Sequence, residues 1–578
     1  MEKRKILTLL GPLGITSLVA MSFQLTLTRF FSVILWYHFV FIVISAALMG
    51  IGIGGWLLFR TRLTAWLLHN PGPRLMLLEL LFGLSMLASL GFAINSPYLD
   101  LLFIYVLIAS VPFILQGIIA AFLFSQFPTS TGLLYTADLV GTALGGLAEI
   151  FAVRYLGPPQ TALALSLLSI LIAPVYLLAL GVEEKKGRKQ AQVGAWQQRL
   201  FWVGTLFLLA LATLGAWSLR QDTVQQWIAR GATPVSGKTM FELMGDLNVE
   251  SRVVFSGWDE FARTDVVEQA GLETKKYIFT DGGAASYMSS FNGNPESIEA
   301  LTTDAGYFPF TWGKRNKVLI IGAGGGRDLL IALRGGSQEI IAVEINRNII
   351  KAMDQFASFN GNLYRRPEIQ LVIGDGRNFV RKANAKYDLI YLPLVFTQAA
   401  TSSGYGLVEN YIFTQEAFAE YFSRLHPKGR LVLKLHGAED LTKAALTAIE
   451  LLQKKKANLS PAAAMQHLLI INGMNNKEHA QQKSQPHFPL LIIRPGLPFS
   501  ATEAKQLQAK AMEMGYEPLY TPWVQKEGVF GSMEDGFLTP AQLIRRANVQ
   551  LEPANDNKPF FYNVEKGIPK NICLARVI

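Results

Sequence analysis

The sequence contains one cysteine, Cys573, among its 578 residues. A single thiol cannot form an intrachain disulfide or supply the cysteine ligands of a zinc finger. The seven histidines are scattered along the chain without the spacing of metal ligands. The sequence also has no Walker motif and no Ser–His–Asp pattern. We therefore expect no disulfide framework and no metal site.

Charged residues are scarce, at 17% of the chain, and the formal net charge of +10 includes no long basic block. The clearest basic cluster, at 183–190, lies between two hydrophobic runs, where positive charge sets membrane topology rather than binding phosphate. We therefore expect no nucleic-acid partner. The chain is also too long for one ordinary domain.

Apolar runs long enough to cross a bilayer dominate the first 220 residues. They predict an α-helical polytopic membrane domain with about seven spans. A globular α/β composition follows. We divide the chain into a transmembrane domain (1–220), a linker with a small β unit (221–312) and an α/β domain with a C-terminal extension (313–578). The predicted spans are roughly 6–28, 31–59, 75–95, 98–127, 131–153, 160–180 and 201–219.

Lysine and arginine are concentrated in alternate loops of this first region. The positive-inside rule then places the N-terminus in the cytoplasm, and seven crossings place the soluble half outside. Large domains can be translocated regardless of loop charge, so the sequence leaves the side of the soluble half open between the outside and the cytoplasm. The basic residues are Lys3, Arg4, Lys5, Arg60, Arg62, Arg74, Lys185, Lys186, Arg188, Lys189 and Arg199.

Four ionisable residues fall inside predicted spans: His38, Glu79, Asp138 and Glu149. Such residues are costly in a membrane and mark either interhelical hydrogen bonds or a substrate or proton pathway. Glycine-rich "LVGTALGG" at 139–146 predicts close helix packing around Asp138. Both interpretations of these residues remain open from the sequence.

Strands and helices alternate after residue 313, which predicts a doubly wound, mainly parallel sheet of the Rossmann type. The segment 250–290 alternates in the manner of a small antiparallel β unit. The first strand of the sheet ends in "VLIIGAGGGRDLLIAL" (318–333), where Gly322, Gly324 and Gly326 form a turn into a helix. Ligands of such sheets bind at the carboxyl ends of the strands.

Two acids at the ends of the next strands strengthen this pattern. Glu344 ends the second strand, where a carboxylate can accept both hydroxyls of a ribose. Asp375 ends the third strand and is followed by Gly376 in "IGDGR", where an acid can accept from an adenine amino group. We predict that these residues and the glycine turn bind an adenosine-type cofactor; alternatively, they are turn residues of a fold that has lost its ligand.

The soluble half resembles the spermidine synthase (polyamine aminopropyltransferase) family, and the whole chain resembles its bacterial membrane-embedded relatives. The motifs are "IIGAGGGRDLLIAL", "AVEIN", "GDGRNFV", "YDLIYL", "VENYIFTQEAF" and "PANDNKPFFYNV". The resemblance implies a class I S-adenosylmethionine methyltransferase-like fold, a location in the bacterial inner membrane, and S-adenosylmethionine or its decarboxylated form as donor.

The chain departs from the family on the side that handles amines. The aspartate of the family's glycine loop is Gly325 here, and the aspartate expected at the end of the fourth strand falls on Pro393. The loop 393–410 has no acid before Glu409. Transfer to an amine needs a base, so Glu409, with Tyr411 beside it, is the catalytic candidate; alternatively, Glu409 is a surface or capping carboxylate.

Three functions are consistent with the sequence. The first is a membrane-anchored transferase that moves a methyl or aminopropyl group to a small or amphipathic acceptor other than a conventional polyamine. The second is a catalytically degenerate, nucleoside-binding domain that regulates the membrane bundle. The third is a transporter or scaffold with a structural soluble domain. The sequence predicts no particular oligomeric state.

Overall fold

The computed structural model describes residues 2–34, 40–95, 102–181, 238–395 and 409–562, apart from 247, 260, 261, 457, 458, 476–485 and 527. These residues form two compact units. The first comprises residues 1–270 and 279–283, and the second comprises 271–278 and 284–578. The predicted span at 201–219 and His38 lie outside the described residues.

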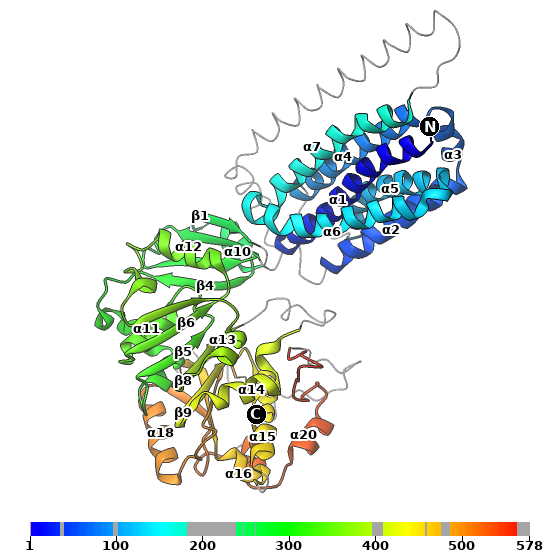
Figure 1. The fold of residues 1–578 in the computed structure, drawn as a ribbon. Helices are drawn as coiled ribbons and strands as arrows, with labels where there is room; N and C mark the ends of the chain where they lie inside the picture. Colours follow the sequence, from blue (N-terminus) through cyan, green and yellow to red (C-terminus); the bar gives the residue numbers. More distant parts are fainter. Residues whose placement is uncertain are drawn as a thin grey trace, which may run out of the picture. The chain divides into compact units, whose positions relative to one another are not determined.

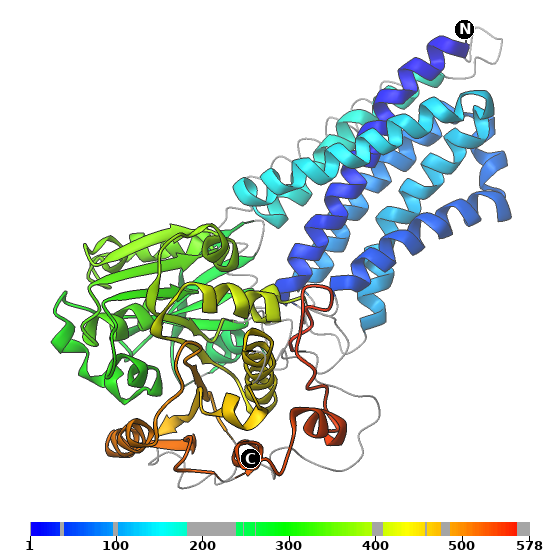
Figure 2. The same cartoon turned by 60° about the horizontal axis from the view of Figure 1, so that its bottom comes forward.

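The first unit contains six helices long and apolar enough to cross a membrane, which agrees with the predicted membrane domain (Figures 1 and 2). The largest differences from the predicted boundaries are in the first two helices. The first helix is longer than the predicted 6–28, and the second begins later than residue 31. The helices are α1 (Glu2–Ile34), α2 (Val40–Arg60), α4 (Pro71–Asn95), α5 (Leu102–Gln126), α6 (Thr131–Leu156) and α7 (Pro158–Leu180), with the short α3 (Leu63–His69) before α4.

Helix α1 packs closely against α6 through glycines. A side chain at Gly141 would overlap the carbonyl oxygen of Gly14, and one at Gly145 would overlap that of Leu18. Small residues let the two backbones approach in this way. The close packing predicted for the "LVGTALGG" segment is therefore confirmed.

Hydroxyls of α1 hydrogen-bond the carboxyl groups of the neighbouring helices. Thr16 donates to Glu79 at 3.0 Å, Ser17 to Asp138 at 2.5 Å and Thr26 to Glu149 at 2.7 Å. Glu79 also accepts from Ser169 at 2.9 Å. Each carboxyl group thus makes an interhelical hydrogen bond, which is the first of the two interpretations left open by the sequence.

The first unit continues at the far end of α1. Lys238 donates to the carbonyls of Ser32 and Val33, near the last turn of α1. By contrast, Leu180, at the end of α7, lines the same cavity as Lys5 at the start of α1. From Lys5 to Ser32 the helix rises about 40 Å. Leu180 and Lys238, on either side of the undescribed 182–237, therefore lie at opposite ends of the bundle.

A four-stranded sheet with the order β1-β2-β3-β4 confirms the predicted β unit. Its first pair is antiparallel. The strands are β1 (Ser251–Trp258), β2 (Arg263–Gln269), β3 (Lys275–Thr280) and β4 (Ala284–Ser289), preceded by the short helix α10 (Thr239–Gly245).

The second unit is built on an eight-stranded sheet with the order β12-β10-β11-β9-β8-β5-β6-β7 (Figure 1). The five strands from β9 to β7 are parallel, as predicted, and β11, β10 and β12 continue the sheet antiparallel. Their bounds are β5 (Lys317–Ile321), β6 (Glu339–Glu344), β7 (Ile369–Ile373), β8 (Tyr387–Pro393), β9 (Leu425–Lys434), β10 (Leu468–Asn475), β11 (Leu490–Ile493) and β12 (Tyr516–Tyr520).

Amphipathic helices cover the sheet, whose central strands are buried. The segment before β5 forms two 3-10 helices, η4 (Pro295–Thr303) and η5 (Ala305–Phe310), and Asp304 between them is the N-cap of η5. The main helices are α11 (Arg327–Arg334), α12 (Arg347–Gln355), α13 (Gly376–Lys382), α14 (Gln415–Ser423), α15 (Ala438–Lys455) and α18 (Ala501–Glu513).

The strand order changes direction at β5, because β6 and β7 lie on one side of it and β8 and β9 on the other. In open α/β sheets a crevice forms at the carboxyl ends of the strands where the order reverses. The glycine turn after β5 and the residues after β8 lie at this point, and all the predicted cofactor residues follow β5, β6 or β7.

Candidate functional site

The turn between β5 and α11 requires glycine at the three predicted positions. Gly322, Gly324 and Gly326 have φ values of +86°, +53° and +84°. Side chains other than glycine rarely adopt this region. The spacing read from the sequence thus corresponds to a real backbone requirement, and it brings α11 directly back against the sheet.

Every backbone N–H of this turn is already hydrogen-bonded within the protein. A loop that cradles a phosphate instead directs free N–H groups at the ligand. No N–H of residues 322–326 is therefore left for a phosphate oxygen, and the turn itself is compatible with a ligand that has no phosphate at this position. The acceptors are Val343 O for the N–H groups of Gly322 and Ala323, Glu344 Oε2 for Gly324, Ser286 Oγ for Gly325 and Ala323 O for Gly326.

Glu344, the predicted ribose acid, is brought beside the glycine turn. Its side chain is buried at the end of β6, where Oε2 accepts from the N–H of Gly324 at 2.9 Å and Oε1 from that of Asn346 at 2.8 Å. A carboxylate oxygen can accept more than one hydrogen bond, so this side chain is the candidate acceptor for a ribose hydroxyl. The backbone bonds thus fix the orientation of the carboxylate, and its role in binding remains a prediction.

Asp375 and Gly376 follow β7, at the same edge of the sheet. Asp375 is the N-cap of α13, where Oδ1 accepts from the N–H of Asn378 at 2.7 Å. A side chain at Gly376 would overlap the Cγ2 methyl of Ile321, so packing against β5 already requires glycine there. The positions agree with an adenine-binding edge, although capping and packing alone also explain both residue types.

The place of the missing loop aspartate is occupied by another strand. A side chain at Gly325 would overlap the carbonyl group of Tyr287 in β4. The N–H of Gly325 also donates to the Ser286 hydroxyl of the same strand at 3.0 Å. Strand β4 therefore lies directly against the turn and excludes the aspartate side chain that the family places there.

A cationic cluster lies next to Pro393, the position of the second missing aspartate. Pro393, at the end of β8, is paired with Lys434 of β9. The buried Lys434 ammonium donates to both carboxylate oxygens of Asp304 at 3.0 Å, and Arg327 pairs with the same carboxylate. Burial lowers the pKa of Lys434 to about 7, and the nearby Arg327 adds to this effect. Two basic groups thus share one carboxylate.

Glu409 and Tyr411, the predicted catalytic pair, do contact each other. The Tyr411 hydroxyl donates to Glu409 Oε2 at 3.0 Å, and both side chains are exposed. This hydrogen bond raises the pKa of the Tyr411 hydroxyl. The backbone carbonyl of Tyr411 accepts from Arg377, which also forms an ion pair with Asp556 at 2.7 Å. The pair is held in place, and its catalytic role remains a prediction.

A partly buried His–Asp pair that the sequence did not predict lies just after β9. His436 Nδ1 is 3.9 Å from the Asp440 carboxylate in the first turn of α15. Burial lowers the pKa of His436 to about 4, and His487 contributes to the shift. Burial also raises the pKa of Asp440 to about 7, and repulsion from the nearby Glu439 carboxylate contributes to this increase. The signal in the sequence was an H-x-x-x-D spacing across a strand–helix boundary.

Tyr562 and Val395 connect this pair to the glycine turn. The Tyr562 ring lies 6.4 Å from the His436 ring, and its hydroxyl donates to the carbonyl of Val395 at 3.3 Å. The Val395 side chain in turn lies against Gly322: a Cβ placed there would be 3.1 Å from Val395 Cγ2. The structure thus brings the turn, the end of β8 and the His436–Asp440 pair together at one edge of the sheet.

Asp388, another acid of the fourth strand, lies at the opposite edge. It is near the start of β8, and its carboxylate accepts from the N–H groups of Asn316 and Lys317 at 3.0 and 3.2 Å. These residues precede or begin β5, away from the glycine turn. Asp388 therefore stabilises the amino edge of the sheet and is not a candidate base.

Comparison with known proteins gives the same class of domain. Residues 306–469 match the model of the spermine/spermidine synthase domain. The polyamine aminopropyltransferase of Buchnera aphidicola is 43% identical over 83 residues, which are 14% of this chain and 29% of that protein. That of Korarchaeum cryptofilum is 35% identical over 79 residues, 14% of this chain and 25% of that protein. The chain thus spans less than a third of the length of these relatives.

Solved structures show more distant likeness. Spermidine synthase from Thermotoga maritima is 18% identical, with coverage of 44% of this chain and 78% of that chain and a TM-score of 0.29. Human methyltransferase-like protein 13, solved with SAH, is 16% identical, with coverage of 38% and 91% and a TM-score of 0.26. TM-scores this low carry no argument about the site.

Residues 306–469 are therefore spermidine-synthase-like, and the sheet that contains them has the expected α/β, methyltransferase-like fold. This domain match and the six apolar helices of the described residues together fit a membrane-anchored spermidine-synthase-like protein.

Proposed function

We propose that the protein is a membrane-anchored transferase that binds S-adenosylmethionine or decarboxylated S-adenosylmethionine at the carboxyl edge of β5, β6 and β7. The observation that carries this proposal is the bond between Glu344 and the glycine turn, whose N–H groups are all used internally. This arrangement offers a carboxylate for a ribose, and residues 322–326 offer no N–H to a phosphate. An adenosyl sulfonium has a ribose and no phosphate.

Such a donor supplies an electrophilic carbon, and the carbon–sulfur bond breaks as the acceptor attacks. The protein has to orient both partners and accept the acceptor's proton. Glu344 and Asp375 orient the adenosine. Two carboxylates are available for the proton, the exposed Glu409 beside Tyr411 and the partly buried Asp440 beside His436.

The acceptor is proposed to be less cationic than a conventional polyamine. A polyamine site needs carboxylates to replace the hydration of several ammonium groups. Here Gly325 and Pro393 stand where the family has aspartates, and Lys434 and Arg327 already share Asp304. The chain also has helices long and apolar enough to cross a membrane. We therefore propose that the protein lies in a lipid bilayer and that its acceptor is amphipathic.

The N-terminus is proposed to lie in the cytoplasm of a bacterial inner membrane. The start of α1, the short helix α3 and the end of α7 line one cavity and so lie at one end of the bundle, and in the sequence lysine and arginine are concentrated beside these helix ends. Lys238 lies at the other end. We therefore propose that the soluble half begins on the non-cytoplasmic side, which requires the donor to be present there.

The transferase proposal is tested with the full chain in nanodiscs of bacterial polar lipids. Donors labelled in the methyl or aminopropyl group are added, and the label is followed into the chloroform-soluble fraction. We expect transfer to that fraction from one of the two donors and no spermidine when putrescine is supplied. Spermidine formation would contradict the proposed acceptor class, and the absence of transfer from either donor would contradict the enzymatic proposal.

A further inference from the structure

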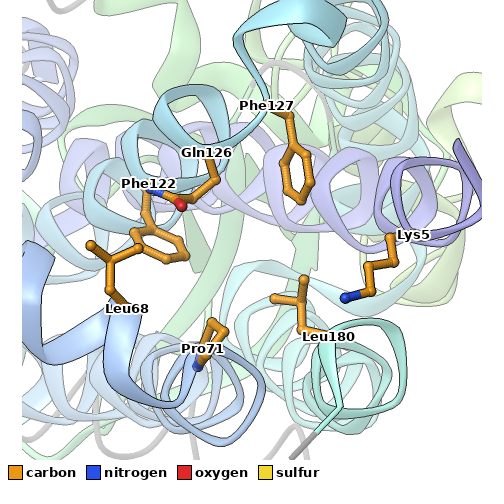
Figure 3. Close-up of a pocket in the computed structure, with 7 residues that line it drawn as sticks. All are labelled: Lys5, Leu68, Pro71, Phe122, Gln126, Phe127 and Leu180. Carbon is orange, nitrogen blue, oxygen red and sulfur yellow. The ribbon is translucent and has the colours of Figure 1, made fainter. Parts of the chain in front are cut away.

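A cavity opens at the end of the helix bundle that carries the basic loops. Its volume is about 370 Å³, and its lining comes from α1, α3, α4, α5, the start of the α5–α6 connection and α7. Such a volume is in the range of small-molecule sites. Figure 3 shows the side chains around it: Lys5, Leu68, Pro71, Phe122, Gln126, Phe127 and Leu180.

The lining is apolar on most sides and cationic on one. Five of the seven residues present hydrocarbon, whereas Lys5 and Gln126 bring an ammonium and an amide. In Figure 3 the end of the Lys5 side chain is turned inward toward the apolar residues. No carboxylate lines the cavity, and among the described residues none forms an ion pair with Lys5. This combination fits a ligand with an anionic head and an apolar body.

The cavity lies at the level where lipid head groups meet hydrocarbon. Lys5, Pro71, Gln126 and Leu180 are the terminal residues of four candidate spans. The neighbourhood offers further polar groups: Arg74, one turn beyond Pro71, stacks on Trp66 at 4.8 Å and has a buried guanidinium nitrogen without a hydrogen-bond partner. Basic side chains at this level attract anionic lipids.

We infer that this cavity binds an anionic glycerophospholipid of the adjoining leaflet, with the phosphate at Lys5 and Gln126 and the start of an acyl chain against Phe122, Phe127 and Leu180. The volume accommodates part of one lipid, whose remaining chain length lies in the bilayer. By the positive-inside rule this leaflet is the cytoplasmic one. The inference is independent of the transferase proposal, because the site lies entirely within the first unit.

Native mass spectrometry of the delipidated full chain tests the inference. Phosphatidylglycerol and phosphatidylcholine with identical chains are titrated separately. We expect tighter binding of phosphatidylglycerol and a loss of about fivefold in its affinity for Lys5→Gln, which corresponds to the roughly 1 kcal/mol that one basic side chain contributes near an anionic surface. Leu180→Trp, which fills the cavity without changing charge, should weaken binding of both lipids.

Two matched variants serve as controls. Arg154→Gln removes an exposed cation at the opposite end of the bundle, and Leu178→Trp enlarges a side chain of α7 that is 66% exposed. Both should bind like the unmodified chain. Equal binding of the two lipids, or equal losses in test and control variants, would overturn the inference. So would binding of inorganic phosphate alone, with the same dependence on Lys5 and no lipid preference.

Discussion

Gly325 and Pro393 distinguish this site most clearly from an aminopropyltransferase site. Strand β4 fills the space beside Gly325, and Lys434 on the neighbouring strand β9 lies opposite Pro393 in the sheet register. A missing acid is therefore not all that marks these positions, because Tyr287 leaves no room for a side chain at Gly325 and the strand partner of Pro393 is a lysine. Restoring one aspartate should not restore polyamine chemistry.

Replacing Gly325 tests this packing. We expect Gly325→Ala to destabilise the protein by about 1–3 kcal/mol, because the new methyl group overlaps the Tyr287 carbonyl and β4 has to move. Thermal unfolding of the full chain measures the effect. Gly437→Ala is the control, since only Glu439 lies within 4 Å of its added methyl, at 3.7 Å. Equal stability of the two variants would show that β4 does not press on the turn.

The His436–Asp440 pair makes the pH dependence of transfer a test of the base. Because the pKa of Asp440 is raised to about 7, this carboxyl is protonated below pH 7 and ionised above it, while His436, with a pKa of about 4, stays neutral. If Asp440 takes the proton, the transfer rate rises about tenfold per pH unit up to pH 7 and then levels off. Glu439, Lys443, His487 and Tyr562 are the other titratable groups around the pair.

Two amide variants separate the candidate bases in the same assay. Asp440→Asn should lower the rate at least a hundredfold and abolish the pH dependence, since base catalysis contributes about 10²–10⁴. Glu409→Gln should have less than a threefold effect. The reverse result would assign the base to Glu409, as the sequence first indicated, and would leave the His436–Asp440 pair a structural role.

At the scale of elements, the close contact between α1 and α6 is expected to contribute to the stability of the helix bundle. Gly141→Val should lower the thermal stability of the full chain in detergent, because the side chain would overlap the backbone of Gly14. Gly146→Val, five residues further on the same helix, has no heavy atom within 4 Å and serves as the control. A loss of stability in both variants alike would mean that helix propensity, and not packing, causes the effect.

The sequence predicted most elements of the sheet, because apolar strand segments alternate with helical patterns of apolar residues between 313 and 437. It also placed Gly322, Gly324, Gly326 and Glu344 next to one another through the rule that ligands bind at strand ends. It could not show that β4 covers Gly325, since this contact joins residues far apart in the chain. Nor did it find the His436–Asp440 pair, whose pKa shifts arise from burial in the tertiary structure.

At the scale of the whole molecule, topology determines which compartment supplies the donor. Leu180 and Lys238 lie at opposite ends of the bundle, which agrees with an odd number of crossings. We therefore expect an alkaline phosphatase fused after Ile578 to be active, because that enzyme folds only outside the cytoplasm. A green fluorescent protein fused at the same place should stay dark. The opposite pair of results would place the soluble half in the cytoplasm and contradict the proposed orientation.

The most direct test of the central claim is calorimetric titration of the full chain with S-adenosylmethionine, decarboxylated S-adenosylmethionine and 5′-methylthioadenosine. We predict that at least one of them binds and that Glu344→Ala weakens its binding about tenfold to a hundredfold, the effect of losing hydrogen bonds to a charged group. Glu339→Ala, at the exposed start of the same strand, should leave the affinity unchanged. No binding of any of the three, or equal affinity of Glu344→Ala and the unmodified chain, would contradict an adenosyl site at this edge of the sheet.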